Sequence, residues 1–286
     1  MKRSYLMSIT AMLIFGTIGI FRRYIPLSSG LLAFSRGILG GFYLFLFMLL
    51  THRKRERVGK SNLVLLVITG ALIGLNWIFL FESYNYTTVS VATMCYYMQP
   101  TIVILVSPLL LGERLTPKKL VCAALAVAGM FLISGMADGG GIGKSDMTGI
   151  LYGLGAAALY ASVIILNKKI SVDDAYLRTM IQLFAASLTI VPYILLTEDI
   201  SSVSLSPESI LLVLVVGIVH TGIAYAMYFG SMKGLKAQSI AVISYIDPVF
   251  ALILSALVLG ETLTVFGITG AVLIIGSAIL SETGRK

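Results

Sequence analysis

Ile210-Leu-Leu-Val-Leu-Val-Val-Gly-Ile-Val-His-Thr-Gly-Ile-Ala224 is the stretch that decides the fold class. Its side chains are apolar or absent except at His220 and Thr221. A membrane-spanning β-strand would alternate polar and apolar residues over about ten positions. A helix instead needs about 20 mainly apolar residues to cross about 30 Å of hydrocarbon. The stretch therefore predicts a transmembrane helix.

The rest of the chain has the same character. Of its 286 residues, 58% are hydrophobic and only 12% are charged, and the mean hydropathy is +0.97. Soluble domains have about 45–50% apolar and about 25% charged residues. We therefore expect an all-α integral membrane protein with about ten transmembrane helices. The expected spans are 4–25, 31–51, 62–83, 89–111, 117–136, 147–170, 176–197, 208–230, 237–259 and 265–282.

Few residues remain outside these spans, so we expect no attached catalytic module, no enzyme activity, no cofactor and no metal site. The apolar run after Lys2 and Arg3 continues to Phe21. It is longer than the apolar part of a signal peptide, which has about 7–15 residues, so we expect it to be retained as the first helix. Cys95 and Cys122 both fall within spans and are expected to be small core residues.

The positive charges predict an orientation. If the N-terminus lies inside and the spans alternate, every Lys and Arg falls inside except Arg22, Arg23, Arg36 and Lys144. Short cytoplasmic loops are enriched in Lys and Arg. We therefore expect both termini in the cytoplasm. Because topology already accounts for the net charge of +8, nucleic acid is not expected as a partner.

An internal repeat divides the chain. Tyr97-Met98-Gln99-Pro100 and Tyr245-Ile246-Asp247-Pro248 are separated by 148 positions. The motifs Gly112-Glu113-Arg114-Leu115-Thr116 and Gly260-Glu261-Thr262-Leu263-Thr264 have the same separation. Two units of five helices must lie in the membrane with opposite orientations, because five is odd. This inverted-repeat architecture is common in secondary transporters. The predicted units are residues 1–137 and 147–286, joined by a linker at 138–146.

At these motifs the chain resembles the drug/metabolite transporter superfamily, in its ten-helix EamA-like branch. The residues that carry the resemblance are Arg36, Pro100, Leu111–Leu115, Asp247-Pro248 and Leu259–Leu263. The family usually has Glu-Pro where this chain has Asp247-Pro248. The resemblance implies a bacterial-type plasma (inner) membrane and export of amino acids, other metabolites or toxic compounds, often coupled to protons. It also implies that spans five and ten support the two halves and mediate assembly, so a homodimer is one expectation.

Ionisable side chains within the spans are candidates for a functional site, because a charge at the bilayer centre costs about 2.5–3.5 kcal/mol on insertion scales. Asp247 could bind a proton or a cationic group, or it could be a protonated residue that packs. His220 could relay protons or bond a neighbouring helix. Glu82 and Arg36 could form a structural pair or a gate near the outer ends of spans three and two. Arg36 could also bind a substrate carboxylate.

Polar and aromatic side chains collect at the same expected depth. Trp77 and Tyr225 are separated by 148 positions, as are Gln99 and Asp247. Aromatic walls with a few convergent polar groups are typical of ligand pockets. The predicted substrate-binding residues are Asn76, Trp77, Tyr96, Gln99, Tyr225, Ser244 and Asp247, and the predicted helix hinges are Pro100 and Pro248. We expect the cavity between spans one, three, four, six, eight and nine.

These observations favour a secondary transporter, and on family grounds an exporter, of a small polar metabolite such as an amino acid. It would work by alternating access in the lipid bilayer. The sequence has no ATP-binding motif, so a gradient, which could be of protons, would supply the energy. One alternative is an exporter of cationic drugs or toxic compounds, for which Asp247 would bind the cation. The alternatives of another class are a lipid-processing membrane enzyme and a receptor or assembly scaffold.

Overall fold

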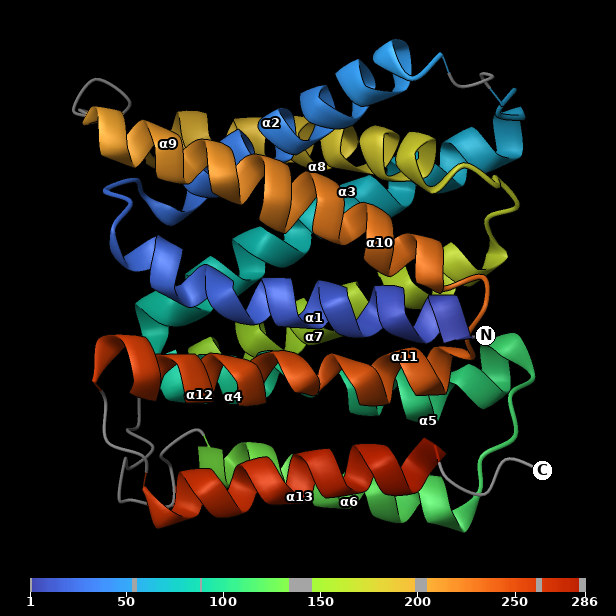
Figure 1. Cartoon of the computed structure of the whole chain (residues 1–286), viewed down its shortest axis with the longest axis vertical. Coiled ribbons are helices and arrows are strands. Elements are labelled where there is room, and N and C mark those ends of the chain that lie inside the picture. Colours follow the sequence, from blue (N-terminus) through green and yellow to red (C-terminus); the bar gives the residue numbers. More distant parts are fainter. Residues whose placement is uncertain are drawn as a thin grey trace.

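The structure is a computed structural model that describes residues 2–52, 56–87, 89–133, 146–198, 205–260 and 264–282. Within these ranges every regular element is a helix, and no strand occurs (Figure 1). The elements are α1 (Lys2–Arg23), α2 (Ser29–Leu50), α3 (Lys60–Tyr86), α4 (Val89–Tyr96), α5 (Gln99–Leu111), α6 (Pro117–Ile133), α7 (Asp146–Lys169), α8 (Ala175–Thr197), α9 (Pro207–Val215), the π-helix η3 (Val216–Ile223), α10 (Ala224–Ser231), α11 (Ala237–Ser244), α12 (Ile246–Leu259) and α13 (Val265–Glu282). The predicted linker, apart from Asp146, and Glu261 of the second motif lie outside the described residues.

The helices are long and apolar enough for a membrane. Eight stretches of the described residues could cross a bilayer by length and composition, and Val265–Ser281 is a shorter apolar helix. α6 has 17 residues within the described part of the chain. The prediction of an all-α integral membrane fold is therefore confirmed, and the number of spans agrees approximately with ten.

Three of the predicted spans are interrupted, which hydropathy does not indicate. The fourth breaks between α4 and α5, and the ninth breaks at Tyr245 between α11 and α12. Pro100 and Pro248 lie in the first turn of the helix that follows each break. Proline fits there because the first turn of a helix does not use its backbone N–H groups for internal hydrogen bonds. The predicted hinge residues therefore lie directly beside the two breaks.

The eighth span changes to a π-helix at its centre. A π-helix carries one extra residue per turn, so backbone carbonyls bond groups five residues away. Side chains bond the same carbonyls here. The Thr221 hydroxyl donates to the carbonyl oxygen of Val216 at 2.9 Å, and His220 Nδ1 lies 3.5 Å from the carbonyl oxygen of Val215. His220 and Thr221 therefore both lie in a widened turn of the helix. This turn packs against α2.

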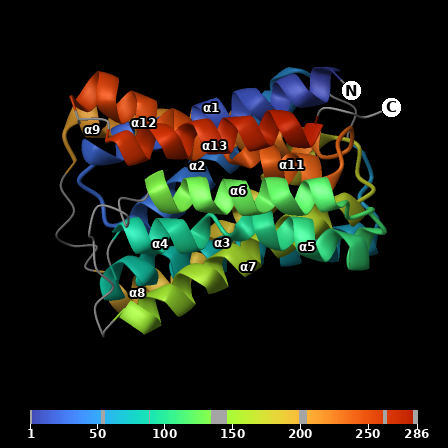
Figure 2. The same ribbon diagram turned by 90° about the horizontal axis from the view of Figure 1, so that it is seen from below.

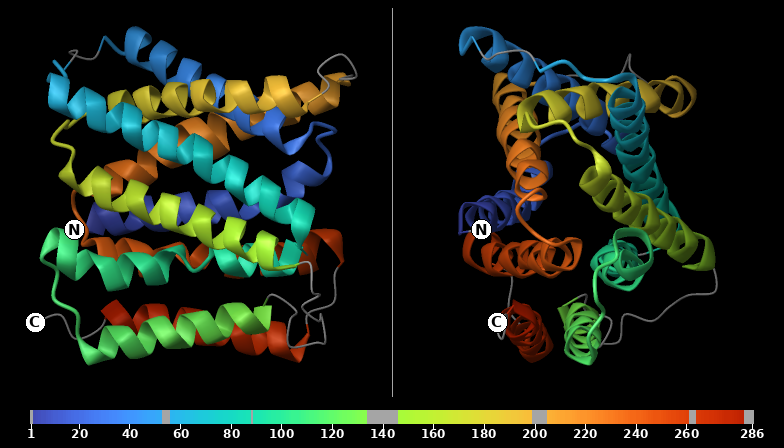
Figure 3. Two further views of the ribbon diagram at one scale, coloured as in Figure 1. Left: turned by 180° about the vertical axis from the view of Figure 1, so that it is seen from behind. Right: turned by 90° about the vertical axis from the view of Figure 1, so that its right-hand side faces the viewer.

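The halves of the chain interleave, as the end-on view shows (Figure 3). α1 packs on α10 and α12, while α7 packs on α3, α4 and α5. The remaining cross-half pairs include α2 with α8 and α6 with α13 (Figure 2). Glycines allow close contacts between the halves: a methyl group at Gly70 of α3 would lie 2.5 Å from the carbonyl oxygen of Gln182 of α8. Exchanging the first and second halves of the chain maps this set of contacts onto itself.

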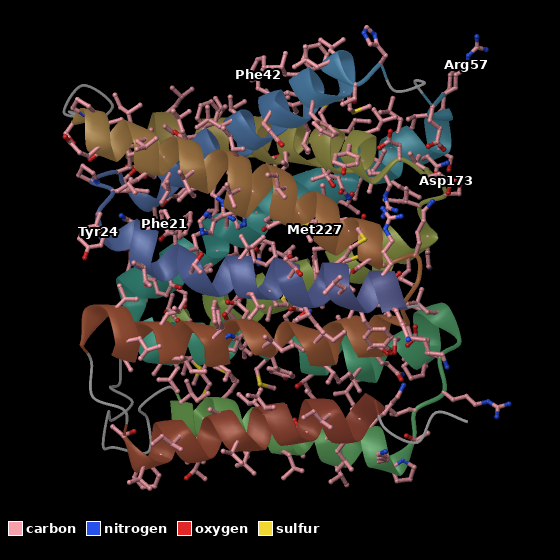
Figure 4. All side chains as sticks on the ribbon, in the orientation of Figure 1. Phe21, Tyr24, Phe42, Arg57, Asp173 and Met227 are labelled. Atoms are coloured by element: carbon pink, nitrogen blue, oxygen red, sulfur yellow. The ribbon has the colours of Figure 1, made fainter. Side chains whose placement is uncertain are left out.

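The two ends of the helices differ. α1 begins and α13 ends at one end, where Arg57 and Asp173 also lie, whereas Tyr24 lies at the other (Figures 1 and 4). We call the first the basic end, because it holds Lys2, Lys60, Lys118 and Lys169 at the helix termini there. The other is called the opposite end.

Candidate functional site

A cavity of about 300 Å³ lies among the helices. Its walls come from the predicted spans one, three, four, six, eight and nine, with Arg36 added from α2. The lining residues are Met12, Phe15, Gly16, Ile18, Gly19, Arg36, Trp77, Leu80, Phe81, Tyr84, Thr93, Tyr96, Tyr97, Gln99, Tyr160, Tyr225, Tyr228, Ser244, Asp247 and Ala251. Gly19 is near the end of α1, Tyr84 near the end of α3 and Thr93 near the start of α4. The cavity therefore extends from mid-helix towards the opposite end.

Aromatic rings form most of the cavity wall. The Tyr225 ring packs edge-on against Trp77, with centroids 6.3 Å apart, and against Phe15, with centroids 5.1 Å apart. Tyr96 and Tyr160 continue the wall, with centroids 6.2 Å apart. Such a wall offers ring faces to an apolar or cationic group and hydroxyls to a polar one.

Arg36 supplies the positive charge of the cavity. Its guanidinium carbon lies 4.7 Å from the centroid of the Trp77 ring. Its Nε donates to the hydroxyl oxygen of Thr221, in the π-helix, at 3.0 Å. The cation–π contact and the hydrogen bond hold the guanidinium in place. Its remaining N–H groups have no acceptor among the residues that the structure describes. Those groups could bind an anionic group in two-point geometry.

Asp247 supplies the carboxyl group of the cavity. It lies in the first turn of α12 and lines the cavity together with Tyr97. Ser244 lies one turn earlier, where its hydroxyl is 3.0 Å from that of Tyr228 and bonds the carbonyl oxygen of Ile240 at 2.9 Å. A carboxyl and a guanidinium therefore line the same small cavity.

Gln99 brings a buried and unpaired hydrogen-bond donor to the cavity wall. Its side chain is 4% exposed, and its Nε2 has no hydrogen-bond partner among the residues that the structure describes. An unpaired buried donor costs about 1–3 kcal/mol. Because Gln99 lines the cavity, a molecule inside the cavity could accept this hydrogen bond.

Three predicted candidates do not line the cavity. Asn76 donates from Nδ2 to the carbonyl oxygen of Ala156 in α7 at 2.7 Å. His220 Nε2 lies 2.6 Å from the Thr17 hydroxyl of α1, and its ring packs edge-on against Phe21. Asn76 thus joins α3 to α7, and His220 joins η3 to α1.

Glu82, the third of these candidates, has other partners than the expected Arg36. The Tyr193 hydroxyl of α8 donates to its Oε1 at 3.0 Å, and Asn85 is 3.4 Å from its Oε2. No ion pair joins Glu82 and Arg36 in the described part of the chain. Glu82 instead links α3 to α8 near the opposite end.

The prediction from sequence also missed lining residues. Phe15, Tyr84, Tyr97, Tyr160 and Tyr228 all face the cavity. The chain has 14 Tyr and 13 Phe, and hydropathy does not separate rings that face lipid from rings that face a cavity. A usable signal existed for Tyr97, which the 148-position repeat relates to Tyr245 beside Asp247.

The basic end is closed by hydrogen bonds between elements. Both carboxylate oxygens of Glu113, after α5, accept backbone N–H groups at the start of α11: Ala237 at 2.7 Å and Gln238 at 3.2 Å. The Gln238 amide donates to Ser107 at 2.9 Å. Lys168 donates to the carbonyl oxygens of Met232 and Leu235 at 2.5 and 2.6 Å. These bonds join α5 to α11, and α7 to the segment between α10 and α11, at the basic end.

Loop contacts add to this closure. The carboxylate of Glu56 accepts the N–H groups of Asp173 and Asp174 at 2.8 and 2.9 Å. Lys233 forms an ion pair with Asp173. The Lys233 ammonium holds the pKa of the Asp173 carboxyl below its ordinary value. These contacts join the segments around α3, α8 and α10 at the basic end.

Comparison with known proteins gives consistent matches. The model of the EamA-like transporter family matches residues 2–135 and 147–283. The chain is 28% identical over 279 residues to the uncharacterized transporter YxxF of Bacillus subtilis, which covers 97% of this chain and 89% of that protein. It is 28% identical to an uncharacterized transporter of Vibrio cholerae over 92% of this chain and 86% of that protein.

Two further matches concern a described activity and a solved fold. A probable amino-acid metabolite efflux pump of Salmonella typhimurium is 29% identical over 61% of both chains. A solved crystal structure superposes with a TM-score of 0.82 over 98% of this chain and 97% of that one, at 22% identity. This superposition concerns the fold only.

Proposed function

This chain belongs to the EamA-like transporter family, and from that premise we propose that it exports a small zwitterionic metabolite, such as an amino acid, by alternating access. The observation that carries the proposal is the presence of Arg36 and Asp247 in one aromatic cavity. A carboxylate would bind the guanidinium, and an ammonium would bind the carboxyl of Asp247 and the neighbouring ring faces. The protein is thus a carrier and not an enzyme.

Gln99, Tyr96, Tyr225 and Ser244 complete the proposed binding site. Gln99 would donate from its unpaired Nε2 to a polar atom of the substrate. The tyrosine rings would cover its apolar part. The proposed site has few polar groups and the cavity has a volume of about 300 Å³. Both features suit a small solute.

The hydrogen bonds at the basic end and the extension of the cavity towards the opposite end support one state of the transport cycle, in which the site is reached from the opposite end. We infer that the basic end faces the cytoplasm of a bacterial-type plasma membrane, because short cytoplasmic loops are enriched in Lys and Arg. The structure then corresponds to a carrier whose site is reached from outside. In the other state the bonds of Glu113 and Lys168 would break, and the cavity would open at the basic end.

An inverted repeat of residues 1–137 and 147–286 would provide the second state. The two separate family matches support this division, as does the exchange of helix contacts between halves. Gly112 and Gly260, 148 positions apart, also both have positive φ, 65° and 67°. Two inverted halves can exchange their packing, and this gives two states of similar energy.

Transport into proteoliposomes tests the proposed function. We expect uptake of a radiolabelled amino acid that is competed by other zwitterions and reduced by Arg36→Gln and by Asp247→Asn. If Asp247 couples transport to protons, Asp247→Asn will abolish pH-driven accumulation but retain downhill exchange. The control is Lys169→Gln, which removes an exposed charge outside the cavity. Absence of flux for every zwitterion, with intact folding, would contradict the proposal.

A cationic drug is the second candidate, which the aromatic wall and Asp247 support. The same vesicles separate the two. A cation without a carboxylate would depend on Asp247 but would be transported equally by wild type and Arg36→Gln. Equal dependence on both residues would favour a zwitterion.

A further inference from the structure

A second hollow lies on the outside of the helix bundle. It is a groove of about 640 Å³ between α6 and the broken helix α4–α5. The lining residues are Met94, Thr101, Leu105, Leu120, Ala123, Ala124, Val127, Ala128, Phe131 and Leu132. Thr101 has the only hydroxyl among them, and this hydroxyl is 2.9 Å from that of Tyr245. The groove therefore offers almost no polar group to a hydrophilic solute.

The position of α6 that forms the groove is fixed by tight packing on its other face. A methyl group at Gly129 would lie 2.7 Å from the carbonyl oxygen of Gly270 in α13. Ala126 and Met130 belong to a buried cluster with Tyr245 and Val249 of the ninth span. α13 contacts both α11 and α12, while α6 contacts α5. Since α6 is held on α13, it cannot move onto α4 and α5 without unpacking that cluster.

The dimensions of the groove fit one lipid leaflet. Its residues on α6 run from Leu120 to Leu132, which corresponds to about 18 Å at about 1.5 Å per residue. One leaflet contributes about 15 Å of a hydrocarbon core of about 30 Å. Exposed Ala124 and Ala128 lie between the larger Leu120 and Phe131 along this helix. An extended acyl chain therefore has room along the whole groove.

Positive charge marks one mouth of the groove. Arg114 and Lys118 are exposed at the basic end, just before Leu120. At the repeat-related positions of the second half, 148 residues later, the chain has Thr262 and Phe266. Basic side chains beside a crevice between transmembrane helices are a known basis for binding anionic headgroups. The positions that carry these two charges in the first half are therefore uncharged in the second half.

We propose that this groove binds an anionic phospholipid, with one acyl chain along α6 and the phosphate against Arg114 and Lys118. A second copy of the chain is less suitable as the occupant. In a twofold dimer the same patch of each copy meets itself, so two concave grooves would face each other and leave a void. A lipid chain fills such a shape without help from a second groove.

Native mass spectrometry of the purified chain in detergent tests the proposal. Phosphatidylglycerol, phosphatidylethanolamine and phosphatidylcholine with identical acyl chains are titrated separately. We expect phosphatidylglycerol to bind at least about fivefold more tightly than phosphatidylcholine, given the contribution of one basic residue near an anionic lipid. Arg114→Gln with Lys118→Gln should remove this preference. Lys60→Gln with Lys169→Gln, which removes two exposed charges elsewhere at the basic end, should retain it.

Filling the groove provides a second, independent arm. Ala124→Leu with Ala128→Leu should weaken binding of all three lipids by about fivefold or more, because the added side chains occupy the space of an acyl chain. The control is Ala158→Leu, the same change at an exposed position of α7. Thermal unfolding without added lipid verifies that each variant is folded.

Three outcomes would overturn the proposal. One is equal affinity for phosphatidylglycerol and phosphatidylcholine in the wild type. Another is unchanged lipid binding in the folded Ala124→Leu, Ala128→Leu variant. The third is that the wild type forms a dimer and that only the Ala124→Leu, Ala128→Leu variant loses it, while this variant still binds lipid. That result would assign the groove to a second copy of the chain. None of these measurements depends on transport, so failure here is separate from failure of the proposed function.

Discussion

At the scale of single residues, Gln99 combines burial with an unpaired donor in the cavity wall. Its Nε2 is buried without a partner among the described residues. Removing an unpaired buried group can stabilise a fold by about 1–3 kcal/mol. We therefore expect Gln99→Leu to raise the thermal midpoint of the substrate-free protein and to reduce transport by about tenfold, since one hydrogen bond to the substrate is lost.

Gln238 is the matched control for this prediction, because its amide nitrogen and its amide oxygen each have a hydrogen-bond partner. It donates to Ser107 and also contacts Lys119. Gln238→Leu should lower the thermal midpoint. If both leucine variants lowered it equally, Gln99 would be a packing residue.

Asp173 allows a prediction about pH. Lys233 lowers the pKa of its carboxyl. A lowered pKa means that the ion pair stabilises this arrangement of the basic end at every pH above the ordinary value of about 4, and that this contribution is lost as the pH falls through the lowered pKa. We expect Asp173→Asn to leave the shape of the transport profile between about pH 5 and 8 unchanged. Proteoliposome flux measures this profile, and a shifted midpoint in that range would contradict the assignment.

The sequence could identify Trp77 and Asp247 because each has a repeat-related partner, and Arg36 because it is a charged residue within an apolar span. It could not separate them from Asn76 and His220. A polar residue in an apolar span indicates a buried partner, but the partner can be a ligand or a neighbouring helix. Asn76 bonds Ala156, and His220 contacts Thr17. Only the packing of the helices decides between these cases.

At the scale of elements, the crossing of α2 and η3 places Arg36. A methyl group at Gly40 would lie 2.9 Å from both the Gly217 carbonyl oxygen and the Gly222 nitrogen. Because both are backbone atoms, the helices would have to separate. We expect Gly40→Ala to destabilise the protein by about 1–3 kcal/mol and to weaken transport by moving Thr221 away from Arg36. Thermal unfolding in detergent and flux measure the two effects.

Gly276→Ala is the control at this scale, because nothing lies within 4 Å of a methyl group there. It should be neutral or stabilise α13 by up to about 1 kcal/mol, since alanine favours helices over glycine. Equal losses in the two variants would show that helix propensity, and not the crossing, is responsible.

Hydropathy predicted the helices within a few residues. For α2 the prediction of 31–51 compares with Ser29–Leu50. Hydropathy could not predict η3, because a π-helix has the same apolar composition as an α-helix. It depends on side-chain bonds such as Thr221 to Val216 and on the fit to α2. The breaks beside Pro100 and Pro248 had a local signal and were predicted as hinges.

At the scale of the whole molecule, Glu113 joins the end of α5 to the start of α11. Its two charge-assisted hydrogen bonds hold the N–H groups of Ala237 and Gln238. Glu113→Gln keeps one acceptor but loses the charge. We expect hydrogen exchange at these two amides to accelerate by about tenfold, because hydrogen bonds to charged groups contribute about 1.5–3 kcal/mol.

Glu56→Gln is the control for this measurement. Glu56 also accepts two backbone N–H groups at the basic end, those of Asp173 and Asp174. Its substitution should accelerate exchange there and leave α11 unchanged. If Glu113→Gln left α11 unchanged as well, Glu113 would not hold the basic end closed.

Trp77 is the only tryptophan of the chain, and it lies in the cavity wall 4.7 Å from the guanidinium carbon of Arg36. The protein therefore contains one indole fluorophore, positioned where a solute would enter, and its emission can be excited selectively over that of the tyrosines. A solute that draws Arg36 away from the indole changes the electric field at the ring, so emission wavelength and quantum yield should report occupancy without any label. Candidate compounds can then be ranked by titration in detergent, before vesicles are prepared or a gradient is imposed.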